Sequence, residues 1–333
     1  LFIYNNCTMI FWIASYPKSG NTWLRTLISA YYYSKDGIFD QSILKNIGQF
    51  PEKRHFVGFN YDQENVADTT KLWIKSQEKI NADKKMRFFK THNVFGKVNG
   101  YDFTNKQNSA GCIYVVRDPR NVITSLKNHY EMNYETSLKW MTNSKNYIYD
   151  IRNVKEDGYS DFQFISSWNM NYKSWRVQKK IPIKIIQYED LLKETYVVFK
   201  DIIEFINKTL NIKEELNRDK LKNSVNSTSF NKLKSDEKKN GFVEAVPSKK
   251  NEEKIIKEID NYIKSTYSEH YSTTKDGFQV QDMLRHLGID KDFCQANAIK
   301  YLARYGKKNG KNRKDLLKAI HYIVLLMSSE DNK

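Results

Sequence analysis

The sequence has few of the features that mark secreted, zinc-binding and membrane-spanning proteins. It contains three cysteines, Cys7, Cys112 and Cys294, and none of them belongs to a CxxC or Cys/His pair of the kind that holds zinc. Their small number and wide separation favour a reducing compartment. There is also no apolar run of about 18 residues, and no basic start followed by a signal-peptide cleavage site. We therefore expect a cytoplasmic protein that has no transmembrane segment.

Positive charge exceeds negative charge, because 55 Lys and Arg face 39 Asp and Glu. Such a surface attracts anions, which include nucleic acids, anionic lipids and small phosphorylated or sulfated molecules, and the charge alone does not choose among them. Many of these lysines are equally well explained as solvated surface residues. With 40% hydrophobic and 14% aromatic residues, the chain is too rich in core-forming side chains to be disordered.

Strand-like and helix-like segments alternate over the first two thirds of the chain. Residues 1–8 precede Met9 and are left out of the expected fold. Short apolar runs predict strands at 10–15, 87–90, 112–116 and 183–188, and helical spacing of apolar residues predicts helices that begin near Trp23 and at 122–130, 162–178 and 190–210. This alternation predicts an α/β domain with a P-loop-like parallel sheet flanked by helices. Ligands of such sheets bind at the carboxyl ends of the strands.

The last third of the chain has a different pattern. Residues 235–254 are rich in lysine and contain Gly241 and Pro247, which predicts a linker, and residues 255–267 predict one more helix. Three apolar helical patterns without any strand signal then follow, around Leu284, Ala298 and Leu317. We therefore predict two domains, an α/β domain at 9–268 and a small all-α module at 269–333.

The segment from Tyr16 to Trp23 joins the first strand to the first helix with the sequence YPKSGNTW. At this place, backbone N–H groups and the positive end of the helix dipole bind phosphate, and the side chain of Lys18 adds a cation. A nucleotide kinase or ATPase would instead show GxxxxGK[ST], with the lysine after the second glycine. That spacing is absent from this segment. The alternative to phosphate binding is that the glycine turn has only a structural role and connects the strand to the helix.

A second anion-binding pair follows the third strand, where Ser125 lies eight residues after Arg117. A guanidinium group makes a forked contact to phosphate, and a serine hydroxyl adds a short donor. Asp118 offers a different interpretation, since a carboxylate after an apolar strand is also typical of a magnesium site in an NTPase. The second strand ends in Lys90, Thr91 and His92, and a histidine there is suited to accept a proton from an attacking hydroxyl.

These motifs resemble those of the cytosolic and bacterial sulfotransferases, whose first loop is close to YPKSGTTW and whose base lies in a KTH motif. The only difference in the first loop is Asn21 in place of threonine. The resemblance covers roughly residues 9–268 and implies 3′-phosphoadenosine 5′-phosphosulfate (PAPS) as co-substrate, with no metal. It implies that His92 is the base, that Lys18 contacts the bridging oxygen of the phosphosulfate, and that Lys90 helps to neutralise the sulfo oxygens.

The same resemblance implies how the nucleotide is held. The 5′-phosphate would be bound by Ser19, Gly20, Asn21 and Thr22, the 3′-phosphate by Arg117 and Ser125, and the adenine by Trp23. Tyr188 and the segment with Thr228 and Phe230 look like the YED and TSF segments that line the adenine in the family, although ordinary packing explains them equally well. The family's late RKG-type loop around the 3′-phosphate is not found, and the lysines of 247–250 are its expected substitute.

The tail, residues 270–327, resembles a small helical family common in bacteriophage genomes and often labelled nucleotide-kinase-like, which suggests a phage origin. Its cations Lys300, Arg304, Lys307 and Lys308 predict a basic face. Such a face binds phosphate or nucleic acid in some proteins, but a solvated helix surface is the favoured interpretation.

Three functions are thus considered: sulfo transfer from PAPS to a hydroxyl or amine, nucleic-acid binding by a phage protein with a vestigial nucleotide fold, and an ATP-dependent kinase. Intact motifs at three strand ends favour the first. The loops at 36–78 and 136–160 are expected to shape the acceptor site, and the sequence leaves carbohydrate, lipid, small alcohol and amine acceptors open.

Overall fold

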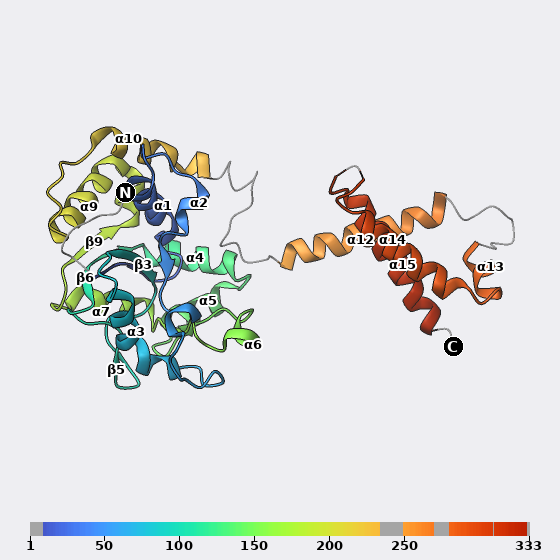
Figure 1. Cartoon of the computed structure of the whole chain (residues 1–333), viewed down its shortest axis with the longest axis horizontal. Helices are drawn as coiled ribbons and strands as arrows, with labels where there is room; N and C mark the ends of the chain where they lie inside the picture. The colour runs from blue at the N-terminus through green and yellow to red at the C-terminus, as the bar shows by residue number, and fades with distance from the viewer. Residues whose placement is uncertain (1–8, 234–248, 270–279, 309, 332–333) are drawn as a thin grey trace. The chain divides into compact units, whose positions relative to one another are not determined.

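A parallel sheet of five strands forms the centre of the first part of the chain (Figure 1). The computed structural model describes residues 9–233, 249–269, 280–308 and 310–331. In spatial order the strands are β2 (Gly48–Gln49), β3 (Arg87–Thr91), β1 (Ile10–Ser15), β6 (Ser109–Val116) and β9 (Ile183–Gln187). All four predicted strands are present, and the predicted P-loop-like parallel α/β fold is confirmed.

The register of the sheet brings the predicted site segments to one edge. Ala14 lies beside Thr91, Ser15 beside Val115, and Val116 beside Gln187. Because parallel strands all end on the same side, the loops after β1, β3, β6 and β9 meet there.

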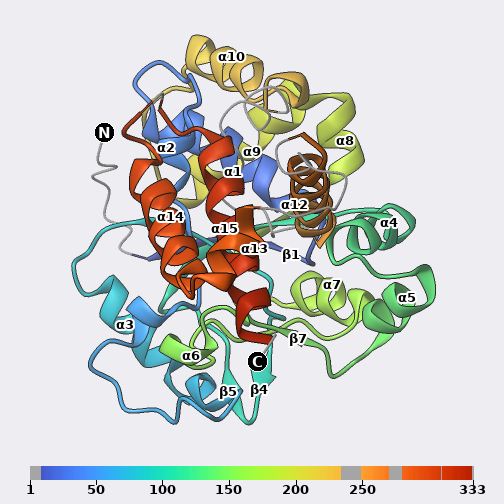
Figure 2. The ribbon, with the colours of Figure 1, turned by 90° about the vertical axis from the view of Figure 1, so that its right-hand side faces the viewer.

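Alternate residues of β1 enter two separate cores. Phe11 and Ile13 pack in a cluster with side chains of α1 (Asn21–Tyr33), α9 (Thr195–Thr209) and α10 (Arg218–Ser227). Trp12 faces the opposite side, where it packs with residues of α3 (Trp73–Asn81) and α7 (Trp168–Val177). Figures 1 and 2 show these two groups of helices on opposite faces of the sheet. The sheet is therefore covered on both sides, which explains why its central strands β1 and β6 are buried and largely apolar along their length.

Two predicted helices are corrected. The one predicted at 162–178 begins only at Trp168, where the side chain of Ser167 caps α7 by accepting from the N–H of Met170 at 3.3 Å. Before it, Gln163 and Phe164 form a strand, and Gln163 pairs with Ile148 in a small two-stranded antiparallel sheet. The helix predicted at 190–210 is two helices, α8 (Tyr188–Lys193) and α9, because the backbone of Glu194 leaves the helical conformation (φ −131°, ψ 51°).

Several short elements were not predicted, since two to five residues are too few to show a hydrophobic period. The helices among them are α2 (Gln41–Leu44), η1 (Lys53–Phe56), η2 (Asp68–Leu72) and α6 (Val154–Asp157). The strands are β4 (Lys97–Val98), β5 (Tyr101–Asp102), β7 (Tyr147–Ile148) and β8 (Gln163–Phe164). The nine-residue helices α3 and α5 (Tyr134–Thr142) were also missed. The predicted helix at 122–130 is α4 (Pro119–His129), which starts earlier because Asp118 caps it.

The chain divides into two compact units, Leu1–Phe242 and Val243–Lys333. The second contains α12 (Lys249–Glu269), α13 (Val280–His286), α14 (Asp290–Arg304) and α15 (Arg313–Asp331). Residues 249–254 belong to α12, so the predicted linker is wrong at its end. Five of these six residues are Lys or Glu, which are good helix formers. The two compact units meet between Phe242 and Val243, earlier in the chain than the predicted domain boundary at 268/269. The predicted domains, 9–268 and 269–333, stay a prediction.

Within the second unit, ion pairs join the helices. Arg313 of α15 lies 2.6 Å from Glu258 of α12, and Lys291 of α14 lies 2.7 Å from Glu330 of α15. Cys294, Ala298 and Ala319 are buried between α14 and α15. In the part of the chain that the structure describes, none of the helices combines the length and apolar character needed to cross a bilayer.

A chain shortened to residues 9–248 is expected to fold without the second unit. Each unit has its own buried side chains, so we expect the core of the first unit to form in the absence of the second. Circular dichroism should show one cooperative thermal transition, within about 2–4 °C of the first-unit transition in the full chain if the change costs no more than about 1 kcal/mol. A shortened protein that melts without cooperativity would contradict the independence of the units.

Candidate active site

The loop between β1 and α1 has an unusual backbone. Lys18 has φ 65° and Gly20 has φ 94°, both in the left-handed region. A Cβ atom at Gly20 would lie 2.2 Å from the ring of Tyr188, so this position needs glycine on two counts. Gly20 is also the N-cap of α1, and no side chain caps the helix there. The loop therefore directs the first N–H groups of α1 toward the strand edge, as in phosphate-binding loops.

Two polar side chains of this loop are buried. Ser19 is fully buried, and its Oγ has no hydrogen-bond partner among the residues described. The side-chain amide of Asn21 donates to the carbonyl of Ile13 at 3.0 Å and to Ser15 Oγ at 3.2 Å. Asn21, which stands where the resemblance expects threonine, thus fastens the start of α1 to the end of β1. Its side-chain N–H groups are used inside the protein, so its backbone N–H is the donor that is left for a ligand.

Arg117, at the end of β6, connects three strand ends. Its Nη1 donates to the carbonyl of Lys18 at 3.1 Å, and its guanidinium lies 4.4 Å from the centre of the Tyr188 ring. Its Nε is buried and has no partner in the described residues. Ser125 lies two turns along α4 and is half-buried. Arg117 of the predicted pair is thus at the strand edge and has unsatisfied hydrogen-bonding capacity, whereas Ser125 lies further along α4.

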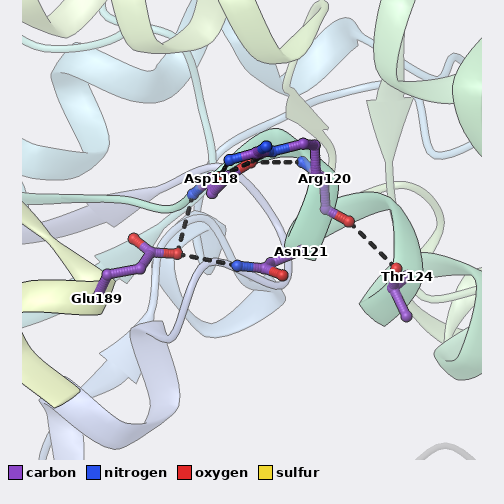
Figure 3. Close-up of polar contacts among 5 residues, drawn as sticks. All are labelled: Asp118, Arg120, Asn121, Thr124 and Glu189. Carbon is purple, nitrogen blue, oxygen red and sulfur yellow. Dashed lines mark hydrogen bonds and ion pairs between the residues drawn. The ribbon is translucent and has the colours of Figure 1, made fainter. Parts of the chain in front are cut away.

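Glu189 is a residue of this edge that sequence reasoning left without a role. Its Oε1 accepts from the backbone N–H of Asp118 at 3.2 Å and from Asn121 Nδ2 at 3.3 Å (Figure 3). Glu189 thereby joins the start of α8 to the start of α4. The YED-like segment, residues 188–190, is the sequence feature from which Glu189 could have been identified.

Asp118 is engaged within the protein. It accepts from the N–H of Arg120 at 2.9 Å as the cap of α4, and it lies 2.5 Å from the Arg120 guanidinium (Figure 3). The Arg120 side chain, through its hydrogen bond to Asp118, holds the pKa of this carboxyl down at about 2. The alternative role of Asp118 as a magnesium ligand is therefore disfavoured. Across the described ranges, no group of three or more His, Cys, Asp or Glu residues is arranged to hold a metal ion.

His92 follows β3 and is nearly buried, with 8% of its surface exposed. Its Nδ1 lies 2.7 Å from the carbonyl oxygen of Ser15. Because a carbonyl only accepts, Nδ1 carries the proton, and in the neutral ring the lone pair is on Nε2. The backbone of His92 is held as well, since its N–H donates to Gln163 Oε1 at 2.7 Å and its carbonyl accepts from Asn171 Nδ2 at 2.9 Å. Sequence reasoning had no signal for Gln163 or Asn171.

A family model described as a sulfotransferase domain matches residues 10–281, more than half of the chain. The chain belongs to the sulfotransferase family. Luciferin sulfotransferase of Photinus pyralis is 24% identical over 262 residues, which are 78% of this chain and 65% of that protein. The chain thus matches less than two thirds of the length of this relative.

Two similar solved structures are of retinol dehydratase. One is a complex with androsterone and the inactive cofactor PAP, with 13% identity, coverage of 81% of this chain and 83% of that chain, and a TM-score of 0.42. The other is a complex with retinol and PAP, with 16% identity, coverage of 73% and 72%, and a TM-score of 0.42.

A second family model, of the uncharacterised family DUF3310, matches residues 265–324 of this sulfotransferase-family chain. That description names no activity, so it gives no support to the nucleotide-kinase-like label. Of the predicted basic face, Arg304 is paired with the buried Asp315 at 2.5 Å, and Lys300 lies 4.5 Å from the centre of the Tyr301 ring. Lys307 and Lys308 are exposed. His270 and Tyr271 lie outside the described residues.

Only some of the residues expected to bind adenine contact one another in the structure. Trp23 donates from Nε1 to the carbonyl of Thr228 at 2.9 Å and meets the Tyr188 ring edge-to-face at 5.8 Å. The hydroxyl of Thr228, the C-cap of α10, donates to the carbonyl of Ser224, and Phe230 is 62% exposed. Trp23, Thr228 and Tyr188 thus form one group, whereas Phe230 makes no ring contact in the described structure. The lysine-rich segment expected to replace the RKG-type loop lies in residues that the structure does not describe, apart from the helical backbone of 249–250.

Proposed function

We propose that this chain transfers a sulfo group from PAPS to a hydroxyl or amine of an acceptor. The observation that carries the proposal is the connection of the first loop to two other strand ends. Arg117 donates to the carbonyl of Lys18 at 3.1 Å, and His92 donates to the carbonyl of Ser15 at 2.7 Å. The proposed proton acceptor is thus fixed to the end of β1, and the proposed phosphate-binding group is fixed to the loop that carries Lys18.

The side chains at this edge fit a doubly phosphorylated nucleotide. Ser19 Oγ and Arg117 Nε are buried polar atoms that find no partner within the described residues, and such atoms are costly unless a ligand pairs with them. The loop and the uncapped start of α1 offer backbone N–H groups for a 5′-phosphate. We assign the 5′-phosphate to Ser19, Gly20, Asn21 and Thr22, the 3′-phosphate to Arg117 and Ser125, and the adenine to Trp23, Tyr188, Thr228 and Phe230.

In the proposed reaction, PAPS supplies the sulfo group that is transferred. His92 accepts the proton of the acceptor hydroxyl on Nε2, while its Nδ1–H to Ser15 keeps the ring in the required tautomer. The acceptor oxygen forms a bond to sulfur as the bond from sulfur to the bridging phosphate oxygen breaks. Lys18 stabilises the charge that develops on that oxygen, and Lys90 neutralises the sulfo oxygens. His92, held by Ser15, thus provides the base, and Lys18 and Lys90 provide two cations. The proposed reaction has no covalent intermediate.

We propose a small molecule with a hydroxyl group as acceptor, because the relative named above is a luciferin sulfotransferase. The loops expected to shape the acceptor site lie side by side, since Lys53 is 2.5 Å from Asp157 and 3.1 Å from the carbonyl of Glu156. Carbohydrate and lipid acceptors, a cytoplasmic location and a phage origin stay predictions from the sequence.

A thermal-shift measurement tests the proposed donor. 3′-Phosphoadenosine 5′-phosphate (PAP) is expected to raise the melting temperature by several degrees, because a ligand at 100 times its Kd stabilises the native state by about 2.7 kcal/mol. ATP with magnesium should give a much smaller shift. Adenosine 5′-phosphate, which lacks the 3′-phosphate, is the matched control and should also shift less than PAP. A shift with ATP and magnesium equal to that with PAP would favour a kinase instead.

A further inference from the structure

His129 ends α4 on the side of the helix that faces the first loop. Val122 and Leu126 of the same helix are buried in a cluster with Tyr16, the residue that opens the loop. Ser125 and His129 are half-buried and lie one turn apart. Positions 122, 125, 126 and 129 are spaced i, i+3, i+4 and i+7, so they share one face of the helix. His129 is therefore on the loop-facing side, one turn beyond the proposed 3′-phosphate ligand Ser125.

Contacts at both ends of α4 hold it against the loop. At the start, Arg117 donates to the carbonyl of Lys18. At the other end, the rings of His129 and Tyr130 lie 4.7 Å apart, that of Tyr130 lies 5.8 Å from Trp140, and Trp140 lies 5.8 Å from Tyr16. A continuous series of aromatic rings thus connects His129 to the residue two positions before Lys18.

The imidazole of His129 has a distinct electrostatic setting. Burial, together with the positive charges of Lys18 and Lys90, lowers the pKa of His129 to about 4. The ring is therefore neutral at pH 7 and offers one N–H donor. In the described part of the chain, neither ring nitrogen of His129 has a hydrogen-bond partner. The two lysines that act on it are those assigned above to the transferred sulfo group.

We propose that His129 binds the sulfo group of the donor, as a third nitrogen group beside Lys18 and Lys90. This inference rests on the proposed function. A third cation at this place would be repelled by the two lysines, whereas a neutral imidazole adds a hydrogen bond to a sulfo oxygen without that cost. His129 would then distinguish PAPS, which carries the sulfo group, from PAP, which does not.

Calorimetric titration of the full chain with PAPS and with PAP tests this inference without an acceptor. In His129→Ala, the affinity for PAPS should fall about tenfold, the effect of one hydrogen bond to a charged group, while the affinity for PAP stays within about twofold. Asn128→Ala is the matched control, because Asn128 is exposed and points from a different side of the same helix. It should change neither affinity.

His129→Gln provides a second variant, since its amide also presents an N–H donor, and it should recover part of the preference for PAPS. Equal losses of PAPS and PAP affinity in both variants, or an unchanged PAPS to PAP ratio in His129→Ala, would overturn the assignment of His129 to the sulfo group. A wild-type chain that binds neither nucleotide would instead refute the proposed function itself, and the inference with it.

Discussion

Replacement of His92 by alanine is expected to lower kcat for sulfo transfer by about 10²–10⁴, the range that a general base contributes. The proposed base has its Nδ1 committed to the carbonyl of Ser15 at 2.7 Å, so only Nε2 serves the acceptor. PAP affinity should change little, because none of the groups assigned to the two phosphates belongs to His92. The effect should therefore appear in turnover and not in donor binding.

His92→Asn separates catalysis from structure. The asparagine amide places an N–H close to the position of the histidine Nδ1, so it preserves the hydrogen bond to Ser15 but has no basic nitrogen. This variant should match wild type in melting temperature and PAP affinity and be as inactive as His92→Ala. Recovery of turnover in His92→Asn would show that His92 acts through the Ser15 contact and is not the base.

The measurement needs an acceptor, which mass spectrometry can identify in cell extract incubated with the protein and PAPS labelled with heavy sulfur. The product that carries the label then serves to measure kcat and KM for wild type and for both variants. Single-turnover rates would show whether the loss lies in the transfer step.

Much of the candidate site was visible in the sequence because its residues are adjacent in the chain or directly follow strands. Lys18, Arg117 and His92 each follow a short apolar run, and a parallel sheet brings such positions to one edge whatever the loops between them do. Residues that support them from distant segments could not be found this way. Gln163 and Asn171 hydrogen-bond to the backbone of His92, although they lie more than 70 residues after it in the sequence. No local sequence pattern predicts such a contact.

The limits of the fold prediction have a similar cause. The central strands are buried on both faces, so each is a plain apolar run that stands out from its neighbours. The segment at 162–167 has apolar residues at spacings that also suit a helix, and only the pairing of Gln163 with Ile148 makes it extended. At position 21, the sequence identified the replacement of threonine by asparagine but not its consequence. The Asn21 amide donates to Ile13 and Ser15, contacts that depend on the close approach of α1 to β1.

Replacement of Arg117 by alanine is expected to weaken PAP binding by about two to four orders of magnitude. A forked contact between a guanidinium and a phosphate comprises two charge-assisted hydrogen bonds, each of which contributes about 1.5–3 kcal/mol. The buried Nε without a partner in the described structure indicates that Arg117 has capacity left for such a contact. Arg117→Lys keeps the charge but not the fork, so it should recover only part of the affinity.

Arg117 also fixes the loop through the carbonyl of Lys18 and packs on the ring of Tyr188, so a weaker PAP complex alone does not identify the phosphate contact. Adenosine 5′-phosphate, which has the 5′-phosphate but no 3′-phosphate, resolves the two roles. If Arg117 binds the 3′-phosphate, wild type should prefer PAP over adenosine 5′-phosphate strongly, and Arg117→Ala should lose most of that preference while its affinity for adenosine 5′-phosphate changes little. If Arg117 only supports the loop, both nucleotides should lose affinity by the same factor, because the 5′-phosphate site would be disturbed in each complex. Parallel calorimetric titrations of the two nucleotides against wild type, Arg117→Ala and Arg117→Lys distinguish these outcomes, and an unchanged ratio of the two affinities would assign Arg117 to the loop.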